Sequence, residues 1–257
     1  MRVLFVAGEV APFSEVSDTA ALLRTLPEAV QEHQSVEPRI LMPRYGVVSE
    51  RRNRLHEVIR LSGEEIAAGG ASDKLAVKVA SIPGIRLQVY FMDSVVFFKR
   101  KGLHADRKTE QVFADNPARA LFFARAALST TRRLGWNPDV VHAAGWMAAF
   151  VPHVLREEFG DDELFASAKS VFTPDVVDGF APALSADEAA ELGLPAACGG
   201  RSLRDIGLGT ADGAAYVASD AAGAGEPEGP SLDPAADPEA LAAAAVELYG
   251  SLTGVTA

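Results

Sequence analysis

The sequence predicts an α/β protein with a Rossmann-like, mostly parallel sheet, helices on both faces and an antiparallel β insertion. Two observations support this fold class. Apolar runs of strand length alternate with amphipathic stretches of helical period along most of the chain. Residues 55–99 break this alternation with three short β-type runs, separated by Gly, Ser, Asp and Pro. The chain has 257 residues, 48% of them hydrophobic, so it can bury a substantial core in one large domain or two small ones.

The N-terminal part predicts a strand, a turn and a helix. Residues 3–7 form an apolar run, and beyond residue 20 apolar residues recur every four positions. Ser17 or Asp18 is expected to cap this helix, because both residue types accept hydrogen bonds from free helix N–H groups. Pro27 is expected to end or kink it, because proline has no N–H to donate.

The later elements continue the alternation of strands and helices. A long helix is expected where Asn and Pro open an amphipathic stretch and Gly closes it. Shorter helices are expected near residue 190 and near residue 206. Strands are expected at 38–43, 139–143 and 168–174, and the two longer helices at 116–135 and 146–158.

Composition shifts divide the chain into three parts. Residues 1–220 are expected to form one domain. Residues 221–236 are rich in Ala, Gly and Pro and are expected to be a linker. Residues 237–252 are expected to form a helix that docks back on the domain, because Asp237 is placed to cap it and Pro238 to open it.

Charge and cysteine content exclude several classes of function. The formal net charge of −11 argues against a nucleic acid or an anionic membrane as partner, since both attract an excess of Lys and Arg. The lone Cys198 cannot form an intramolecular disulfide or a cysteine-based zinc site. The N-terminal apolar run is interpreted as a first strand rather than a signal peptide, because Glu9 interrupts it. We therefore expect a cytoplasmic protein.

Three turns that follow predicted strands are the candidate ligand site, since ligands of parallel sheets bind at the carboxyl ends of strands. Their sequences are APFSEVSD, HAAGW and FTPDVVDGF. None is a dinucleotide fingerprint, a Walker A loop or a nucleophile elbow, and the histidines show no zinc-binding spacing. We predict no cofactor and no metal ion. The candidate cleft residues are Ser14, Glu15, Ser17, Asp18, His142, Trp146, Thr173 and Asp175.

Three of these features allow two interpretations. His142, at a strand end, either faces a ligand or forms hydrogen bonds that order its loop. Trp146, at a helix start, either stacks on a sugar or anchors the core. The basic cluster ERRNR at 50–54 is either a solvated turn or a contact for a phosphate or a partner.

Taken in order, the stretches MRVLFVAGEVAPFS, LMPRYGVV, GWNPDVVHAAGWMAAFVPHVL and DDELFASAKSVFTP resemble the N-terminal half of bacterial glycogen and starch synthases, glycosyltransferase family 5. The resemblance covers residues 1–220 and is closer still to a short synthase-like form with a single domain. It implies one half of a GT-B fold. It also implies a relation to retaining enzymes that extend an α-1,4-glucan from ADP-glucose in a cleft between two Rossmann-like domains.

The first turn departs from the pattern of that family. After APFS the pattern is K-T-G-G-L-A-D, but here Glu15 replaces the lysine, and Ser17 and Asp18 replace both glycines. Asp18 is expected to fill the anion site by binding N–H groups of its own helix. Glu15 is expected to repel a diphosphate, because a like-charge contact at an effective dielectric near 20 costs about 4 kcal/mol.

The second turn also departs from its pattern, H-x-H-D-W-H. It keeps the first histidine and the tryptophan, as His142 and Trp146. The second histidine, the aspartate and the last histidine are replaced by Ala144, Gly145 and Met147.

In the third turn, the pattern F-T-x-H-N-L keeps Thr173 but has Asp175 and Val176 in place of its histidine and asparagine. Polar groups that the family places around the sugar are therefore missing at all three turns. The second domain, which the resemblance implies would bind most of the nucleotide, is also expected to be absent.

Two functional hypotheses remain open, so the sequence does not decide whether the chain is an enzyme. The first is a catalytically impaired relative in glucan metabolism that binds a glucan or sugar, or pairs with a protein partner. That partner would be a glycosyltransferase or a second copy of the chain. The second is a subunit of an ADP-glucose-dependent α-1,4-glucan glucosyltransferase that a separate nucleotide-binding domain completes.

A third possibility rests on the carboxylates alone. If the strand ends converge, the acidic residues of the turns would share one mouth, which could hold a divalent cation or one protonated carboxyl group. The alternative is that these acids are dispersed and solvated. The residues concerned are Glu9, Glu15, Asp18, Asp175 and Asp178.

Overall fold

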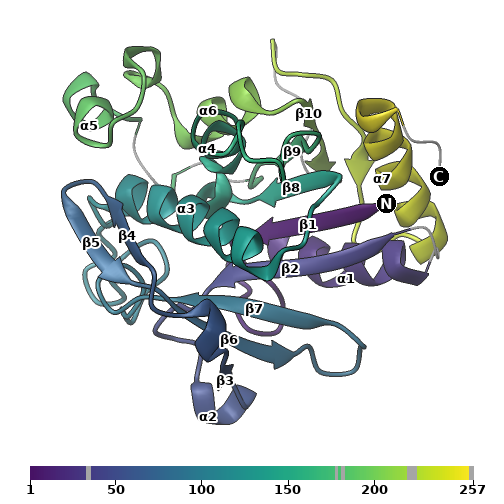
Figure 1. Ribbon diagram of the computed structural model, residues 1–257, viewed down its shortest axis with the longest axis horizontal. Coiled ribbons are helices and arrows are strands. Elements are labelled where there is room, and N and C mark those ends of the chain that lie inside the picture. The colour runs from purple at the N-terminus through teal and green to yellow at the C-terminus, as the bar shows by residue number, and fades with distance from the viewer. Residues whose placement is uncertain (33–35, 177–178, 181–182, 219–224, 255–257) are drawn as a thin grey trace.

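An eight-stranded sheet forms the centre of the protein (Figure 1). The computed structural model describes residues 1–32, 36–176, 179–180, 183–218 and 225–254. The strands of the sheet are β1 (Arg2–Ala7), β2 (Glu37–Pro43), β3 (His56–Glu57), β6 (Ala76–Ser81), β7 (Gln88–Asp93), β8 (Val140–Ala144), β9 (Lys169–Thr173) and β10 (Gly213–Ala214). Their order is β10-β9-β8-β1-β2-β7-β6-β3. The neighbours from β10 to β7 are parallel, and β6 and β3 are antiparallel additions at one edge. This confirms the predicted fold class.

β1 lies in the middle of the sheet because it is apolar on both faces. Val3 pairs with Pro38 of β2 on one side and with Val140 of β8 on the other. Residues 3–7 are fully buried. A parallel strand covered on both faces is typically a continuous apolar run, which is what the sequence shows here.

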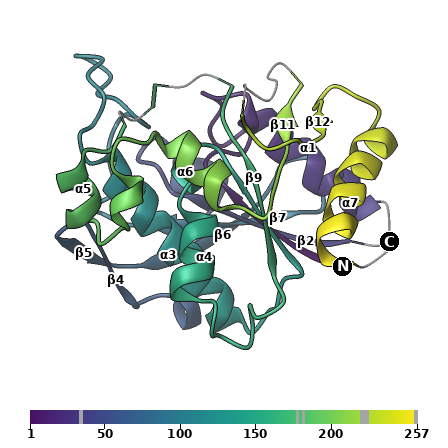
Figure 2. The same cartoon turned by 90° about the horizontal axis from the view of Figure 1, so that it is seen from above.

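Helices cover both faces of the sheet (Figures 1 and 2). Right-handed crossovers place the helices that precede β8, β9 and β10 on one face, and the helix between β1 and β2 on the other. The first group is α3 (Asn116–Leu134), α4 (Val151–Glu158) and α6 (Leu203–Thr210); the other face carries α1 (Thr19–Glu32) and the C-terminal α7 (Pro238–Thr253), which pack on each other. The short α2 (Glu50–Asn53) and α5 (Ala186–Glu191) lie at the periphery. None of the helices in the described part of the chain is long and apolar enough to cross a membrane.

α1 continues through Pro27 to Glu32, so the proline does not end the helix; the alternative expectation, a kink, stays a prediction. The proline removes one helical hydrogen bond, a cost of about 3 kcal/mol in a helix interior. Leu26, Pro27 and Val30 are all buried. Their apolar contacts with the sheet and α7 offset that cost.

The inserted β segment adds a second, smaller sheet. β4 (Glu65–Ala68) and β5 (Ala71–Lys74) form an antiparallel hairpin. Gly69 and Gly70 connect them with φ values of 55° and 74°, which suit a tight two-residue hairpin turn. β6 and β7 form the longer antiparallel pair, and β7 joins the insertion to the parallel sheet beside β2.

The C-terminal part closes over α1. β11 (Tyr216–Val217) and β12 (Ser231–Leu232) form a short parallel pair, so the segment expected to be a linker contains a strand. Asp237 caps α7 by accepting from the N–H groups of Glu239 and Ala240. The helix continues past Gly250, and Gly254 ends it in a left-handed conformation. The division into a domain, a linker and a docked helix stays a prediction.

Candidate functional site

The three candidate turns meet at one edge of the sheet. In the pairing registers, Ala7 of β1 lies beside Ala144 of β8, and Ala144 lies beside Thr173 of β9. Because these strands are parallel, the turns that follow them emerge next to each other. The structure therefore brings the first turn together with two turns that lie more than a hundred residues further along the sequence.

A buried carboxylate organises the first turn. Glu9 is 4% exposed and accepts from the backbone N–H groups of Val16, at 3.1 Å, and Ser17, at 2.7 Å. The Ser14 hydroxyl donates to the same carboxylate. Asp18 is exposed, so the expectation that Asp18 fills the anion site was wrong, and Glu9 engages the N–H groups of the turn instead. A signal was present in the sequence, since Glu9 is a lone charge in an apolar run and needs buried partners.

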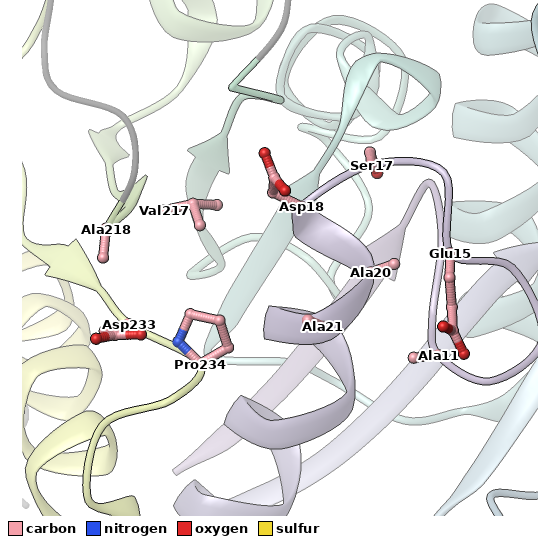
Figure 3. A pocket seen from close by; sticks show the side chains of 10 residues that line it. All are labelled: Ala11, Glu15, Ser17, Asp18, Ala20, Ala21, Val217, Ala218, Asp233 and Pro234. Atoms are coloured by element: carbon pink, nitrogen blue, oxygen red, sulfur yellow. The ribbon is translucent and has the colours of Figure 1, made fainter.

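The start of α1 borders an acidic cavity of about 510 Å³ (Figure 3). Its lining combines the first turn and α1 with the segments around β11 and β12. Three carboxylates take part, and no basic side chain is among the lining residues of the described chain. A negative ligand therefore meets like charge here. The lining residues are Ala11, Glu15, Ser17, Asp18, Ala20, Ala21, Val217, Ala218, Asp233 and Pro234.

A second cavity, of about 650 Å³, lies on the other side of Glu15. Val16, Val47 and Leu103 supply apolar surface, and Val16 and Val47 are 55% and 40% exposed. The rim is polar and carries both signs of charge: Ser14, Glu15, Lys101, His104, Asp106, Arg107 and Glu110. A cavity with an apolar floor and many donors and acceptors at its edge suits a neutral, hydroxyl-rich ligand.

His142 lies in the core rather than in a cleft. Its side chain is fully buried, and both ring nitrogens are within hydrogen-bond distance of hydroxyl groups. Nδ1 lies 2.7 Å from the Tyr249 hydroxyl, and Nε2 lies 2.8 Å from the Thr173 hydroxyl. Burial lowers the pKa of His142 to about 3, so the ring is neutral. This geometry favours the ordering role, and the histidine ties β8 to β9 and to α7.

Trp146 and Asp175 connect the second and third turns. The backbone N–H of Trp146 donates to Asp175 Oδ2 at 2.6 Å, and the Thr19 hydroxyl donates to Asp175 Oδ1 at 2.9 Å. The Trp146 ring is 8% exposed and stacks on Phe180, with centroids 6.1 Å apart. Burial, with a smaller contribution from the charge of Glu9, raises the pKa of Asp175 to about 6, against the opposing effect of the hydrogen bonds from Trp146 and Thr19.

Arg119, which the sequence analysis did not single out, lies beneath the site. It is fully buried, and its guanidinium donates to the carbonyl groups of Phe97 and Leu103 and to the Asn116 side chain. In the described part of the chain, its Nη2 has no hydrogen-bond partner. The guanidinium carbon lies 5.9 Å from the centre of the Trp146 ring. Burial lowers the pKa of Arg119 to about 10. A buried arginine in an amphipathic helix pattern gives little signal in one sequence.

The carboxylates do not gather into a cation site in the described residues, where no group of three or more His, Cys, Asp or Glu is placed to hold a metal ion. Glu9 and Asp175 engage separate donors, while Glu15 and Asp18 are exposed. Asp178 lies outside the described residues. The pKa of Asp175 is raised to about 6, so this carboxyl group is mainly ionised at neutral pH and gains its proton only in mildly acidic solution.

The basic cluster at 50–54 forms α2 and the residue that ends it. Glu50 pairs with Arg44 at 2.7 Å and with Lys78 at 2.8 Å, which fixes the start of this short helix. The arginines of the cluster are exposed and do not border either cavity described above.

Comparisons with known proteins match most of the chain. A family model described as the starch synthase catalytic domain matches residues 2–192. Glycogen synthase from Chlorobium phaeobacteroides is 39% identical over 172 residues, which are 67% of this chain and 35% of that protein. Glycogen synthase from Pelodictyon phaeoclathratiforme is 38% identical with the same coverage. The chain therefore spans about a third of the length of these curated relatives.

Among solved structures, the chain is similar to the catalytic domain of starch synthase IV from Arabidopsis thaliana, bound to ADP and acarbose. The TM-score is 0.66 and the sequence identity is 21%. The match covers 84% of this chain and 44% of that one. At this identity the likeness shows the shared fold.

Proposed function

Because this chain belongs to the starch synthase catalytic domain family, we propose that it is a catalytically impaired relative of glycogen synthase that binds a glucan or sugar in glucan metabolism. The observation that carries the proposal is the occupied first turn. Glu9 accepts from the N–H groups of Val16 and Ser17, so these two donors are engaged within the turn and are not free to bind a phosphate.

The charges around that turn add to this argument. Glu15 stands where the family pattern has a lysine, and together with Asp18 and Asp233 it gives the adjoining cavity three carboxylates. A diphosphate placed there would meet uncompensated like charge. One such contact, at about 4 kcal/mol, corresponds to a loss of affinity of roughly a thousandfold.

The cavity beside Val16 and Val47 supports the sugar-binding part of the proposal. Its apolar floor can pack against the C–H faces of a pyranose ring, and its polar rim can meet the hydroxyl groups. The solved starch synthase IV domain holds acarbose, a sugar-like ligand, on a related fold. A glucan is uncharged, so it avoids the repulsion that the acidic turn imposes on a sugar nucleotide.

Calorimetric titration with maltopentaose tests the sugar site. The protein is expected to bind it, and Val47→Glu is expected to weaken binding at least tenfold, because the change puts a charge on the apolar floor. Val95→Glu is the matched control, since Val95 is 66% exposed and does not line the cavity. An equal effect of both variants, or no binding by the unchanged protein, contradicts the sugar site.

The second candidate is a subunit of an active ADP-glucose-dependent glucosyltransferase. The observation that favours it is the share of the relatives that this chain matches. The match covers 35% of the Chlorobium phaeobacteroides enzyme, so the unmatched part of that enzyme is about twice as long as the matched part. We would measure the melting temperature with ADP and ADP-glucose, alone and with the C-terminal part of the Chlorobium enzyme added. A rise with the nucleotide supports the second candidate by mass action, and no rise supports the first.

A further inference from the structure

Asp175 joins three segments of the strand-end edge. One carboxylate oxygen accepts from Thr19 at the start of α1, and the other accepts from the backbone N–H of Trp146 after β8. The backbone carbonyl of Asp175 accepts from Arg204 of α6, at 2.9 Å. The side chain is 6% exposed, so these contacts form inside the protein.

Gly145 makes room for this carboxylate. Its backbone, with φ 80° and ψ 162°, lies in a region that only glycine adopts at low cost. A Cβ atom at this position would lie 3.3 Å from Asp175 Oδ1, 3.5 Å from Oδ2 and 3.3 Å from Thr19 Oγ1. The carboxylate of Asp175 therefore stands in the space that a side chain on residue 145 would enter.

We propose that Asp175 is the positioning residue of this edge and that Gly145 is its required partner. In this pair, Asp175 in the turn after β9 provides the carboxylate that holds the turns together. Gly145 in the turn after β8 has no side chain, and this leaves room for that carboxylate. The family pattern quoted above has the aspartate at the position of Gly145 and no carboxylate at the position of Asp175. In this chain the carboxylate is thus supplied by the turn after β9 instead of the turn after β8.

The charge of Asp175 matters for this role. A carboxylate accepts stronger hydrogen bonds than a neutral carboxyl group, and the 2.6 Å contact with the Trp146 N–H is of the short, charge-assisted kind. Glu9 from the first turn, Tyr45 after β2 and Arg204 from α6 are the ionisable groups that face Asp175. Burial and Glu9 both favour the protonated form, so the pKa of Asp175 is raised and the tether weakens as the pH falls through about 6.

Nuclear magnetic resonance of the protein labelled with ¹⁵N-tryptophan tests the tether. The chain has two tryptophans, so two backbone amide signals are expected, and Trp136→Phe assigns them. The Trp146 amide proton is expected far downfield and should move upfield with a midpoint near pH 6. The Trp136 amide should not follow, and Asp175→Asn should abolish the titration. A Trp146 amide that does not titrate, or that titrates equally in Asp175→Asn, overturns the proposal.

A double-mutant cycle tests the pairing with Gly145. Gly145→Ala is expected to lower the melting temperature of the unchanged protein. In the Asp175→Ala background the same substitution is expected to lower the melting temperature by about 3 °C less, because the carboxylate that crowds the new Cβ is gone. Gly200→Ala is the matched control: Gly200 has φ 80° too, but a Cβ there meets nothing within 4 Å. Its effect should be the same in both backgrounds. Additive effects of the Gly145 and Asp175 changes overturn the pairing. If Asp175→Ala does not fold, the resonance experiment on the unchanged chain still tests the tether.

Discussion

At the scale of single residues, the site is built on polar groups that are buried and satisfied. Glu9, His142 and Asp175 are each less than 10% exposed, and each has at least two hydrogen-bond partners. The partners of Glu9 lie in its own turn, whereas those of His142 and Asp175 lie in distant segments. Removing one partner of such a hydrogen bond leaves the other group buried and unpaired. The resulting loss in free energy of unfolding is larger than the net contribution of the bond itself.

The Tyr249 hydroxyl is expected to stabilise the fold through His142. Tyr249→Phe removes the partner of His142 Nδ1 and leaves a buried nitrogen unsatisfied. We expect the free energy of unfolding to fall by about 1–3 kcal/mol, measured by urea unfolding. Tyr90→Phe, at a half-buried tyrosine of β7, is the control and should cost less. Equal losses in the two variants would contradict the role assigned to Tyr249.

Asp175 and His142 are expected to give opposite pH dependences. The pKa of Asp175 is about 6 in the folded protein against 3.8 for the free group, so the folded state binds more protons between these values. Burial and the charge of Glu9 outweigh the hydrogen bonds to the charged form, so protonation stabilises the folded state even though it weakens the tether to Trp146. The contribution of Asp175 to stability is full below pH 3.8 and is lost as the pH rises through 6, a change of about 3 kcal/mol. The pKa of His142 is lowered from 6.5 to about 3, so its contribution is lost as the pH falls below 6.5.

The difference between the unchanged protein and Asp175→Asn isolates the first effect. Urea unfolding at several pH values should show that the unchanged protein gains stability relative to Asp175→Asn as the pH falls from 6 to 4. A constant difference over this range would show that Asp175 has an ordinary pKa.

At the scale of elements, strand periodicity and Gly or Pro boundaries predicted most of what forms. The parallel strands were predictable because each is a short apolar run, and α3 because Pro117 and Gly135 mark its ends. Pro27 misled because a buried helix tolerates an internal proline when tertiary packing outweighs local propensity. β12 was missed because two paired residues, Ser231 and Leu232, leave no periodic pattern.

The cleft residues were predictable only as far as the strand ends. Parallel strands of known order bring their turns together, so Asp175 and Trp146 could be placed near each other from the sequence. The partners of Glu9 and the burial of Arg119 depend on side-chain packing between distant segments. The sequence signals that Glu9 needs buried partners but does not say which groups supply them, and it gives little sign that Arg119 is buried.

Docking of α7 is expected to depend on its buried face. Ala245 is fully buried, whereas Ala243, half a turn away, is exposed. Ala245→Glu places an unpaired charge in an apolar contact, and we expect a loss of at least ~3 kcal/mol by urea unfolding. Ala243→Glu should change stability by less than about 0.5 kcal/mol. If the two variants unfold alike, α7 is not held to the body by this face.

At the scale of the whole molecule, the chain combines a well-formed family fold with altered strand-end turns. The sheet order, the helices on both faces and the buried core are those of an intact α/β protein. The departures from the family pattern lie in the three turns and include Glu15 and Asp18 in the first and Gly145 and Asp175 in the other two.

Glucose transfer tests the central claim most directly. The purified protein is incubated at micromolar concentration with radioactive ADP-glucose and glycogen, and label in the precipitated glycogen is counted over hours. The Chlorobium phaeobacteroides glycogen synthase serves as the positive control. We predict no incorporation above the protein-free blank from a preparation that binds maltopentaose. Incorporation that grows with time and with protein concentration would contradict the proposal that this chain is a catalytically impaired relative.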